Sequence, residues 1–319
     1  MKAAVLASAD ATPVYADFAD PEIGEQQHLM TMVAAGIHPV ARALATGAHH
    51  GSEGRWPLVP GVDAVARTAD GVLVYTGWVR PPLGTFAERI AVSGGGTPLP
   101  AGADPVAVAG GLNPGLASWL PLLGRSADGP LGTVLVLGAT GVAGTIAVQN
   151  ALVMGAEHVI AAGRNSEALE ALAGTDRTLV PLSGDVETDA AALASAFGSR
   201  RPSTVLDFVW GAPAEAAFAA FTRAVFEADQ HPVAYIEIGD KAGRTAALPA
   251  ALLRSSAIAI SGSGAGSLDA RTMASQVPVF MARIADGSVT IPTTAYPLSE
   301  VATAWSDSTP GHRVVLTNE

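Results

Sequence analysis

Cysteine is absent from this sequence of 319 residues. Without thiols the chain can form no disulfide, hold no metal through a thiolate and use no cysteine nucleophile. A reducing compartment is compatible with that composition, and we expect a cytoplasmic protein. The apolar run that opens the chain, Met1–Leu6, is very short and Asp10 soon follows. It therefore predicts a first β-strand rather than a signal peptide.

Basic residues are scarce, because 18 Lys and Arg stand against 29 Asp and Glu and the formal net charge is -11. This balance disfavours non-specific binding to nucleic acid or to anionic membranes, since both need clustered positive charge. No uninterrupted apolar run approaches the roughly 20 residues of a membrane-spanning helix. Hydrophobic residues make up 49% of the chain, which is ample for a packed core. We expect a soluble protein whose partner is a small molecule.

The pattern of apolar residues changes along the chain, whose length suits two domains. Up to about Leu99, short β-like runs are separated by Gly and Pro, at 28–35, 62–68 and 72–76. From Asp104 to about Ala265, strands alternate with alanine-rich helices, which is typical of a parallel sheet. The expected strands are 133–137, 158–162, 204–209, 233–238 and 257–260, and the expected helices are 142–154, 166–173, 190–197 and 212–226. Further β-like pieces at 290–296 and 313–316 indicate a discontinuous first domain.

The most informative motif joins a strand, a glycine turn and a helix, in the order that a pyrophosphate site requires. The strand Thr133–Leu137 leads directly into a loop with the spacing GxxGxxG instead of the usual GxGxxG. Glycine lets the backbone approach phosphates, and the helix N-terminus supplies free N–H groups and a positive dipole. A plain strand-to-helix turn could also carry these glycines. The predicted cofactor contacts in the loop are Gly138, Ala139, Thr140, Gly141, Val142, Ala143 and Gly144.

The second expected strand ends in Gly163, Arg164 and Asn165, where an NAD-binding fold has an acid for the ribose 2′-hydroxyl. A carboxylate would repel a 2′-phosphate, whereas Arg164 could bind it through charge-assisted hydrogen bonds and stack on adenine. The alternative is a solvated arginine in a loop. The sequence therefore favours NADPH, with these three residues in its site.

Several short motifs occur together in an order typical of one family. They are Met1–Ala4, Val33–Val40, Pro60–Asp63, Gly84–Glu88, Leu99-Pro100, Asn113-Pro114, Ser118-Trp119, Ile238-Gly239, Arg254–Ser256, Ser261–Gly264, Tyr296–Glu300 and Gly311–Leu316, besides the nucleotide loop. Over essentially its whole length the chain resembles the zinc-free medium-chain dehydrogenases/reductases of the quinone oxidoreductase group.

The resemblance implies an α/β protein in which a GroES-like catalytic domain is interrupted by a doubly wound Rossmann domain. We place the catalytic domain at 1–111 and 266–319 and the NADPH-binding domain at 112–265. The resemblance also implies a homodimer in which residues 257–261 pair with their copy, because an unpaired apolar edge strand invites aggregation. Further cofactor contacts implied by the family are Trp210, Gly211, Ile238, Gly239, Gly262, Ser263 and Gly264, although each could also be an ordinary turn residue.

The positions at which zinc-dependent relatives carry their metal ligands have other residues here. The chain has Ile37-His38 after Gly36, and Val62-Asp63 after Gly61. The four cysteines of the structural zinc lobe are missing as well. His49-His50 is the one adjacent histidine pair, and a loop role suits it better than metal ligation. We therefore predict no metal site.

Hydride transfer without a Lewis acid needs a substrate that is already electrophilic, such as a quinone or an enone. The candidate catalytic residues are His38 and Asn113, and the candidate substrate-binding residues are Arg42, Trp56 and Trp119. His38 occupies a position where relatives commonly carry Asn, and it could act as an acid or simply pack before Pro39. Asn113 could instead cap a helix that starts at Pro114. The tryptophans could belong to the core.

Two other functions stay open at this stage. One is reduction of a ketone or imine in a biosynthetic pathway, which His38 as proton donor would suit. The other is an NADPH-binding sensor without turnover, because a fold does not guarantee activity. A short-chain dehydrogenase is rejected, since none of Tyr15, Tyr75, Tyr235 and Tyr296 has a lysine four positions later.

Overall fold

The computed structural model describes residues 1–49, 51–79, 82–198, 200–223, 232–264 and 269–318. It divides into two compact units, one formed by Met1–Pro114 with Ala274–Glu319 and the other by Gly115–Met273. The first unit is thus discontinuous in sequence. Our predicted boundary between 111 and 112 stays a prediction, and the one between 265 and 266 lies outside the described residues, as does His50.

The first unit is built on a seven-stranded sheet with the path β14-β15-β3-β4-β5-β7, in which β6 also pairs with β3. All these pairs are antiparallel except β14 with β15. The strands are β3 (Gln27–Gly36), β4 (Val65–Arg67), β5 (Leu73–Tyr75), β6 (Arg89–Ser93), β7 (Thr97–Pro98), β14 (Thr293–Pro297) and β15 (Arg313–Thr317). The helices are α1 (Pro39–Ala45), η1 (Leu298–Glu300) and α9 (Val301–Ser306).

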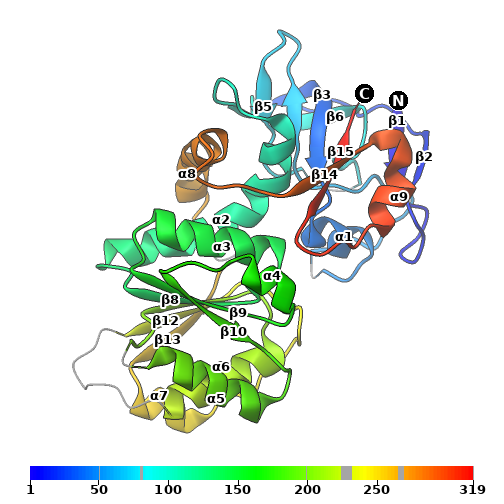
Figure 1. Cartoon of the computed structure of the whole chain (residues 1–319). Coiled ribbons are helices and arrows are strands. Elements are labelled where there is room, and N and C mark those ends of the chain that lie inside the picture. The colour runs from blue at the N-terminus through cyan, green and yellow to red at the C-terminus, as the bar shows by residue number, and fades with distance from the viewer. Residues whose placement is uncertain (50, 80–81, 199, 224–231, 265–268, 319) are drawn as a thin grey trace. The chain divides into compact units, whose positions relative to one another are not determined.

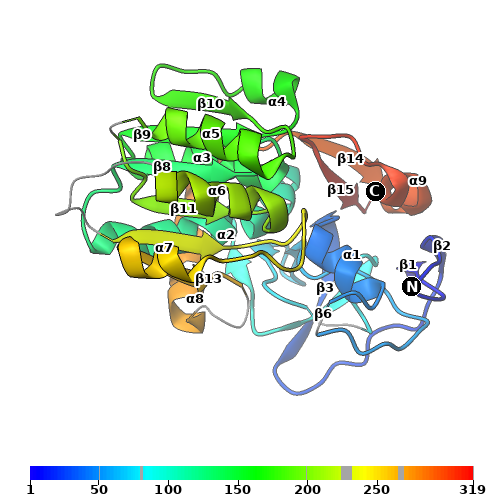
Figure 2. The same ribbon diagram turned by 90° about the horizontal axis from the view of Figure 1, so that it is seen from below.

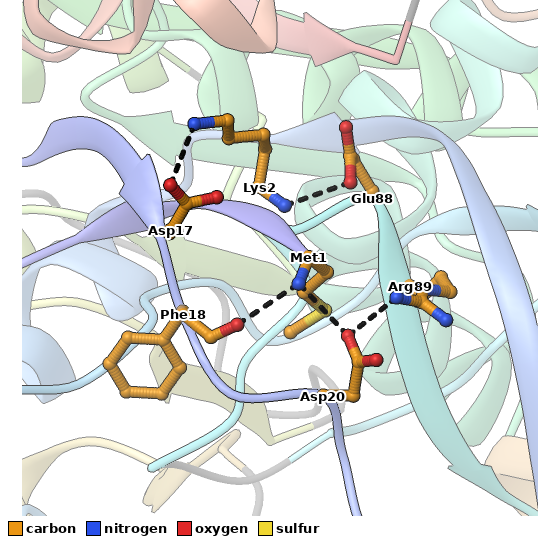
Figure 3. A network of polar contacts seen from close by, with 7 residues as sticks. All are labelled: Met1, Lys2, Asp17, Phe18, Asp20, Glu88 and Arg89. Carbon is orange, nitrogen blue, oxygen red and sulfur yellow. Dashed lines mark hydrogen bonds and ion pairs between the residues drawn. The ribbon is translucent and has the colours of Figure 1, made fainter.

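A separate antiparallel ribbon of β1 (Lys2–Val5) and β2 (Val14–Asp17) begins the chain. Polar contacts tie it to β6 (Figure 3). The N-terminal ammonium lies 2.9 Å from Asp20, whose same oxygen lies 2.6 Å from Arg89, and the backbone N–H of Lys2 donates to Glu88 at 2.8 Å. The predicted first strand is therefore present as β1, which covers Lys2–Val5.

The second unit contains a six-stranded parallel sheet with the order β10-β9-β8-β11-β12-β13. Figure 2 shows β10 and β13 at its opposite edges. The strands are β8 (Thr133–Leu137), β9 (His158–Gly163), β10 (Arg177–Pro181), β11 (Thr204–Asp207), β12 (Val233–Glu237) and β13 (Ile258–Gly262). The crossover helices are α3 (Val142–Val153), α4 (Ser166–Glu170), α5 (Val186–Phe197), α6 (Gly211–Arg223) and α7 (Ala250–Ser255). These elements confirm the predicted α/β fold, although β10 and α7 were not predicted and residues 224–226 of the expected helix lie outside the described residues.

Alternation along the buried strands creates a core on each face of this sheet (Figure 1). Leu135 and Leu137 point to the face covered by α5 and α6, where Phe218 is fully buried. Val134 and Val136 point to the opposite face, which α3 covers. Both faces are buried, which explains why the strands have nearly continuous apolar sequences.

The helix α2 (Pro105–Ala127) begins in the first unit and ends in the second, and α8 (Ala270–Ala285) returns the chain. Among the described residues, α2 is the one helix whose length and composition would suffice to cross a membrane, and 67% of its most apolar window is buried in the structure. A buried core helix of a soluble protein meets the same criteria. The alternative that Asn113 caps a helix starting at Pro114 is wrong, because Asn113 lies inside α2.

Candidate nucleotide and catalytic sites

The nucleotide loop of the second unit lies between β8 and the first turn of α3. Gly138 has a φ of 84°, which favours glycine, and Gly144 lies against the turn. A Cβ at Gly144 would lie 2.1 Å from the carbonyl oxygen of Gly138, so no larger residue fits without moving the backbone. Gly138 and Gly144 therefore let the strand, the turn and the helix pack closely.

The start of α3 has N–H groups available for a ligand. Gly141 is its N-cap residue, with φ -83° and ψ 161°, and it provides no side-chain cap. Its carbonyl accepts from Thr145 N–H at 2.8 Å, while the Thr145 hydroxyl donates to Ala139 at 3.0 Å and steadies the turn. Uncapped N–H groups and the helix dipole together suit a phosphate. Val142 and Ala143 are half-buried in this turn.

The neighbouring strand β9 places Arg164 beside the loop. Gly163 ends the strand, and a Cβ there would lie 2.6 Å from Thr140 Cγ2, so β9 and the loop are in close contact. Arg164 is exposed and follows directly. The Asn165 side chain caps α4 by accepting from Ala168 N–H at 3.1 Å. The structure thus leaves the Arg164 guanidinium in solvent and gives Asn165 a structural role.

The strand order reverses between β8 and β11, and in doubly wound sheets ligands bind at that point. Trp210 and Gly211 follow β11 there, with positive φ of 51° and 58°. Buried Asp207 fixes this turn, since its Oδ1 accepts from Val209 N–H at 2.9 Å and Trp210 N–H at 2.8 Å.

Asp207 also accepts a 2.6 Å hydrogen bond from the buried Tyr235 hydroxyl. Burial raises the pKa of Asp207, although the hydrogen bonds from Tyr235 and the turn act in the opposite direction. Burial and the charges of Asp207 and Asp240 raise the pKa of Glu237 as well. The sequence analysis missed this acidic group, which could be inferred only once β11 and β12 are paired.

The remaining predicted contacts lie at the carboxyl ends of β12 and β13. Ile238 and Gly239 are half-buried and both donate to the Asp207 carbonyl, at 2.7 and 3.2 Å. Gly262 and Gly264 are exposed, whereas Ser263 is buried and its hydroxyl has no hydrogen-bond partner among the described residues. All these predicted contacts therefore lie at the carboxyl ends of the parallel strands.

His38 and Asp63 form a buried pair in the first unit. His38 is the N-cap residue of α1, and Pro39 starts that helix. Its Nε2 lies 3.1 Å from Asp63 Oδ1, and both side chains are 1% exposed. This contact has the distance of an ion pair but not the angles of a hydrogen bond. Gly36 makes room for the imidazole, because a Cβ there would lie 2.6 Å from Nε2.

Two donors hold the other oxygen of Asp63. The Tyr75 hydroxyl and the Asn113 amide each donate to Oδ2 at 2.8 Å. Burial would raise the pKa of Asp63, but the His38 charge and these hydrogen bonds outweigh it and hold that pKa below its usual value. Burial, together with the Asp63 charge, raises the pKa of Tyr75 well above its usual value. His38 and Asn113, predicted separately, therefore meet on one carboxylate.

The other substrate-binding candidates are placed differently. Arg42 lines a depression in the first unit, next to Pro39. Trp56 donates to the Ala45 carbonyl at 3.0 Å and packs in a small apolar cluster. Trp119 is 5% exposed in the part of α2 that belongs to the second unit. Trp119 is therefore a core residue, whereas Trp56 is half-buried.

No group of three or more His, Cys, Asp or Glu side chains that could hold a metal occurs among the described residues. Asp63 and Tyr75 are the parts of the His38 site that sequence reasoning missed. Asp63 ends the motif Pro60–Asp63, but only the fold reveals that it faces His38.

No family model matches the sequence. A curated protein from Emericella nidulans, named probable NADPH-dependent quinone reductase tdiC, is 30% identical, and the alignment covers 95% of this chain and 96% of that protein. The structure is also similar to a Thermus thermophilus quinone oxidoreductase studied with NADPH, with 24% identity, a TM-score of 0.77 and coverage of 99% and 100%. A mycobacterial quinone oxidoreductase has 17% identity, a TM-score of 0.80 and coverage of 99% of each chain. These two structures support the fold.

Proposed function

Since this chain belongs to the quinone oxidoreductase-like group of the medium-chain dehydrogenase/reductase superfamily, we propose that it is an NADPH-dependent reductase of quinones or α,β-unsaturated carbonyls. The observation that carries the proposal is that the Gly138–Gly144 loop leads into the N-terminus of α3, where no side chain caps the N–H groups, and that Arg164 stands where an NAD enzyme has an acid. The similarity to an NADPH-dependent quinone reductase over nearly the whole chain adds the substrate class.

The second unit would hold the cofactor. The N–H groups of the α3 first turn would bind the pyrophosphate, and Arg164 would bind the 2′-phosphate from its exposed position. The part of the cofactor beyond the pyrophosphate would lie where the strand order reverses between β8 and β11. The residues that would contact it there are Trp210, Gly211, Ile238 and Gly239. The bound cofactor supplies hydride to the acceptor.

The first unit would supply the proton. A quinone that gains a hydride becomes a hydroquinone anion and needs one proton to become neutral. His38 would donate it, because imidazole can act as an acid and the ring lies 3.1 Å from the Asp63 carboxylate. Asn113 and Tyr75 would keep Asp63 charged and fixed.

Loss of NADPH absorbance with a panel of quinones, enones, ketones and imines tests the function. We expect turnover of quinones or enones, with NADPH preferred over NADH. The predicted independence of metal requires that a chelator leaves the rate unchanged. Activity confined to ketones or imines would favour the second candidate, a biosynthetic carbonyl or imine reductase, which the buried His38–Asp63 pair also suits. Saturable NADPH binding without turnover across the panel would favour a sensor.

Two glycine variants test the cofactor site. Gly144→Ala forces a Cβ to within 2.1 Å of a backbone oxygen, and we expect NADPH affinity to fall more than tenfold. Gly124→Ala is the matched control, because no atom lies within 4 Å of its Cβ position on exposed α2 surface. Unchanged NADPH affinity in Gly144→Ala would remove the loop from the site.

The proposal extends to the assembly. The edge strand β13 pairs with β12 alone among the described strands, and Ala259 and Ser261 on it are exposed. We expect a homodimer in which two copies of β13 pair. Light scattering would show a dimer that Ile260→Pro converts to a monomer, because the ladder with β12 uses the backbone groups of Ala257, Ala259 and Ser263 and leaves the N–H of Ile260 at the outer edge. A monomeric unmodified protein would refute the proposal. The boundaries 1–111, 112–265 and 266–319 and a cytoplasmic location belong to the same proposal.

A further inference from the structure

The first unit contains a depression of about 140 Å³ lined by two arginines, Arg42 and Arg313. We call it the arginine pocket. Ile37 and Pro39, the residues on either side of His38, also line it. A ligand in this pocket would therefore contact the segment that carries the proposed proton donor.

Arg313 carries a buried charge that the protein does not balance at close range. Its side chain is 8% exposed, its Nη1 donates to the Ile37 carbonyl at 3.1 Å, and its Nε has no hydrogen-bond partner among the described residues. Burial lowers the pKa of Arg313 to about 10, although the more distant Asp63 charge opposes the shift. A buried guanidinium with an unused donor is costly unless an anion approaches it.

Arg42 is held in place by neutral groups. Its guanidinium lies 4.6 Å from the centre of the Trp305 ring and donates to the Trp305 carbonyl. The side chain is half-buried, and burial lowers its pKa. In the described part of the chain, neither Arg42 nor Arg313 forms an ion pair with a carboxylate. Two fixed cations thus face one pocket.

The Asp307 carboxylate lines the same pocket, and both of its oxygens already accept hydrogen bonds from neighbouring groups. Asp307 Oδ1 accepts from the backbone N–H and the hydroxyl of Thr309, at 2.8 and 2.7 Å. Its Oδ2 accepts from the Tyr296 hydroxyl at 3.0 Å. Asp307 offsets part of the charge of Arg42 from a distance, but the pocket keeps an excess of positive charge.

We infer that the arginine pocket binds an anionic oxygen group of the substrate, and that the preferred acceptors are quinones or enones carrying a carboxylate. Planar guanidinium groups match a carboxylate with two hydrogen bonds, and hydrogen bonds between charged groups are stronger than neutral ones. The position next to Ile37 and Pro39 would place the reactive ring near His38. This inference rests on the proposed reductase activity and adds a substrate class to it.

A naphthoquinone with a propionate side chain and its methyl ester form a matched pair for the test, because they differ in charge and little in reactivity. We expect kcat/KM with NADPH to be at least tenfold higher for the acid than for the ester. Equal values for both would overturn the inference while leaving the quinone reductase activity intact. Failure to reduce either compound, together with no turnover of any quinone or enone in the panel, would overturn the proposed function itself.

Substitution of Arg42 tests the pocket directly. Arg42→Gln should lower the acid-to-ester ratio of kcat/KM about tenfold, through KM for the acid, since one charged hydrogen bond is worth about that factor. The control Arg67→Gln removes the same charge from an exposed strand position of the same unit and should leave the ratio unchanged. An unchanged ratio in Arg42→Gln would count against the inference.

The phosphates of NADPH are a second source of anionic oxygen. Titration of NADPH into the unmodified protein and Arg42→Gln, followed by calorimetry without acceptor, separates the two sources. We expect the dissociation constants to agree within about twofold. If Arg42→Gln weakens NADPH binding tenfold and leaves the acid-to-ester ratio unchanged, the pocket serves the cofactor and the inference is wrong.

Discussion

Each unit buries one aspartate that accepts a hydrogen bond from a buried tyrosine, yet the two pairs have opposite electrostatics. Asp63 accepts from Tyr75 at 2.8 Å and Asp207 accepts from Tyr235 at 2.6 Å. The pKa of Asp63 is lowered, because the charge of His38 and the hydrogen bonds outweigh burial, whereas burial raises the pKa of Asp207. Both aspartates are buried and both accept from a tyrosine, so neither feature explains why their pKa values shift in opposite directions. The difference lies in the neighbouring charge, because Asp63 faces His38 whereas Asp207 accepts from backbone N–H groups of a turn.

Replacing each aspartate by asparagine should give the largest changes in the free energy of unfolding, and the two changes should differ the most. Asp63→Asn leaves His38 without the buried carboxylate at 3.1 Å, and we expect a loss of about 3–5 kcal/mol in the free energy of unfolding. Asp207→Asn keeps an acceptor for the N–H groups of Val209 and Trp210 and should cost about 1 kcal/mol. Urea denaturation measures both. Equal losses would show that the His38 charge does not distinguish the two sites.

The pH dependence of stability should separate the same aspartates. A carboxyl with a lowered folded-state pKa stabilises above its unfolded value, near about pH 4, and that contribution is lost as the pH falls through the folded pKa. A raised pKa works in the other direction, so the Asp207 contribution is present below about pH 4 and is lost as the pH rises through its folded pKa.

Unfolding free energies measured from about pH 3 to 7 would test these signs. The acid-side decline should be shallower in Asp63→Asn than in the unmodified protein. In Asp207→Asn the loss on raising the pH above about 4 should be shallower. Curves that stay parallel to that of the unmodified protein would mean that neither folded-state shift exists.

For the tyrosines, the larger loss in the free energy of unfolding should occur in the second unit, whereas for the aspartates it should occur in the first. Asp63 Oδ2 keeps the hydrogen bond from Asn113 after Tyr75→Phe, whereas Asp207 Oδ2 loses the hydroxyl hydrogen bond in Tyr235→Phe. We expect losses of about 1 and about 2 kcal/mol, respectively. Urea midpoints at neutral pH measure them, with the two Asp→Asn variants as reference. A larger loss in Tyr75→Phe would contradict the argument from the remaining donor.

The two sites also differ in how far the sequence predicts them. The loop from Gly138 to Gly144 is contiguous and depends on glycine and backbone, so its strand-turn-helix structure could be predicted in order. The His38 site joins side chains from four separate segments, and no local pattern links Asp63 or Tyr75 to His38. A site formed by the backbone of one contiguous segment can be predicted from the sequence. A network of side chains from separate segments can be identified only once the fold is known.

The misplaced elements have similar causes. The helix α2 contains Gly110, Gly111 and Pro114, which local propensity treats as breaks. In the fold, a Cβ at Gly111 would lie 2.4 Å from side-chain atoms of Ile291, so this side chain packs directly against the backbone of the helix at Gly111. The edge strand β10 (Arg177–Pro181) has one fully buried residue, Val180, and lacks the apolar run that marked its neighbours.

An exposed aspartate gives the smallest expected effect and a baseline for the buried ones. Asp20 lies between the N-terminal ammonium and Arg89 on the protein surface (Figure 3). The hydrogen bond from the ammonium is the main cause of its lowered pKa, and Arg89 adds to the shift. Asp20→Asn should shift the urea midpoint less than the substitutions of Asp63, Asp207, Tyr75 and Tyr235, and the shift should be smaller near about 1 M salt, because salt weakens interactions between exposed charges. A midpoint shift as large as that of Asp63→Asn would show that the ribbon of β1 and β2 depends on this contact as strongly as the first unit depends on the His38–Asp63 pair.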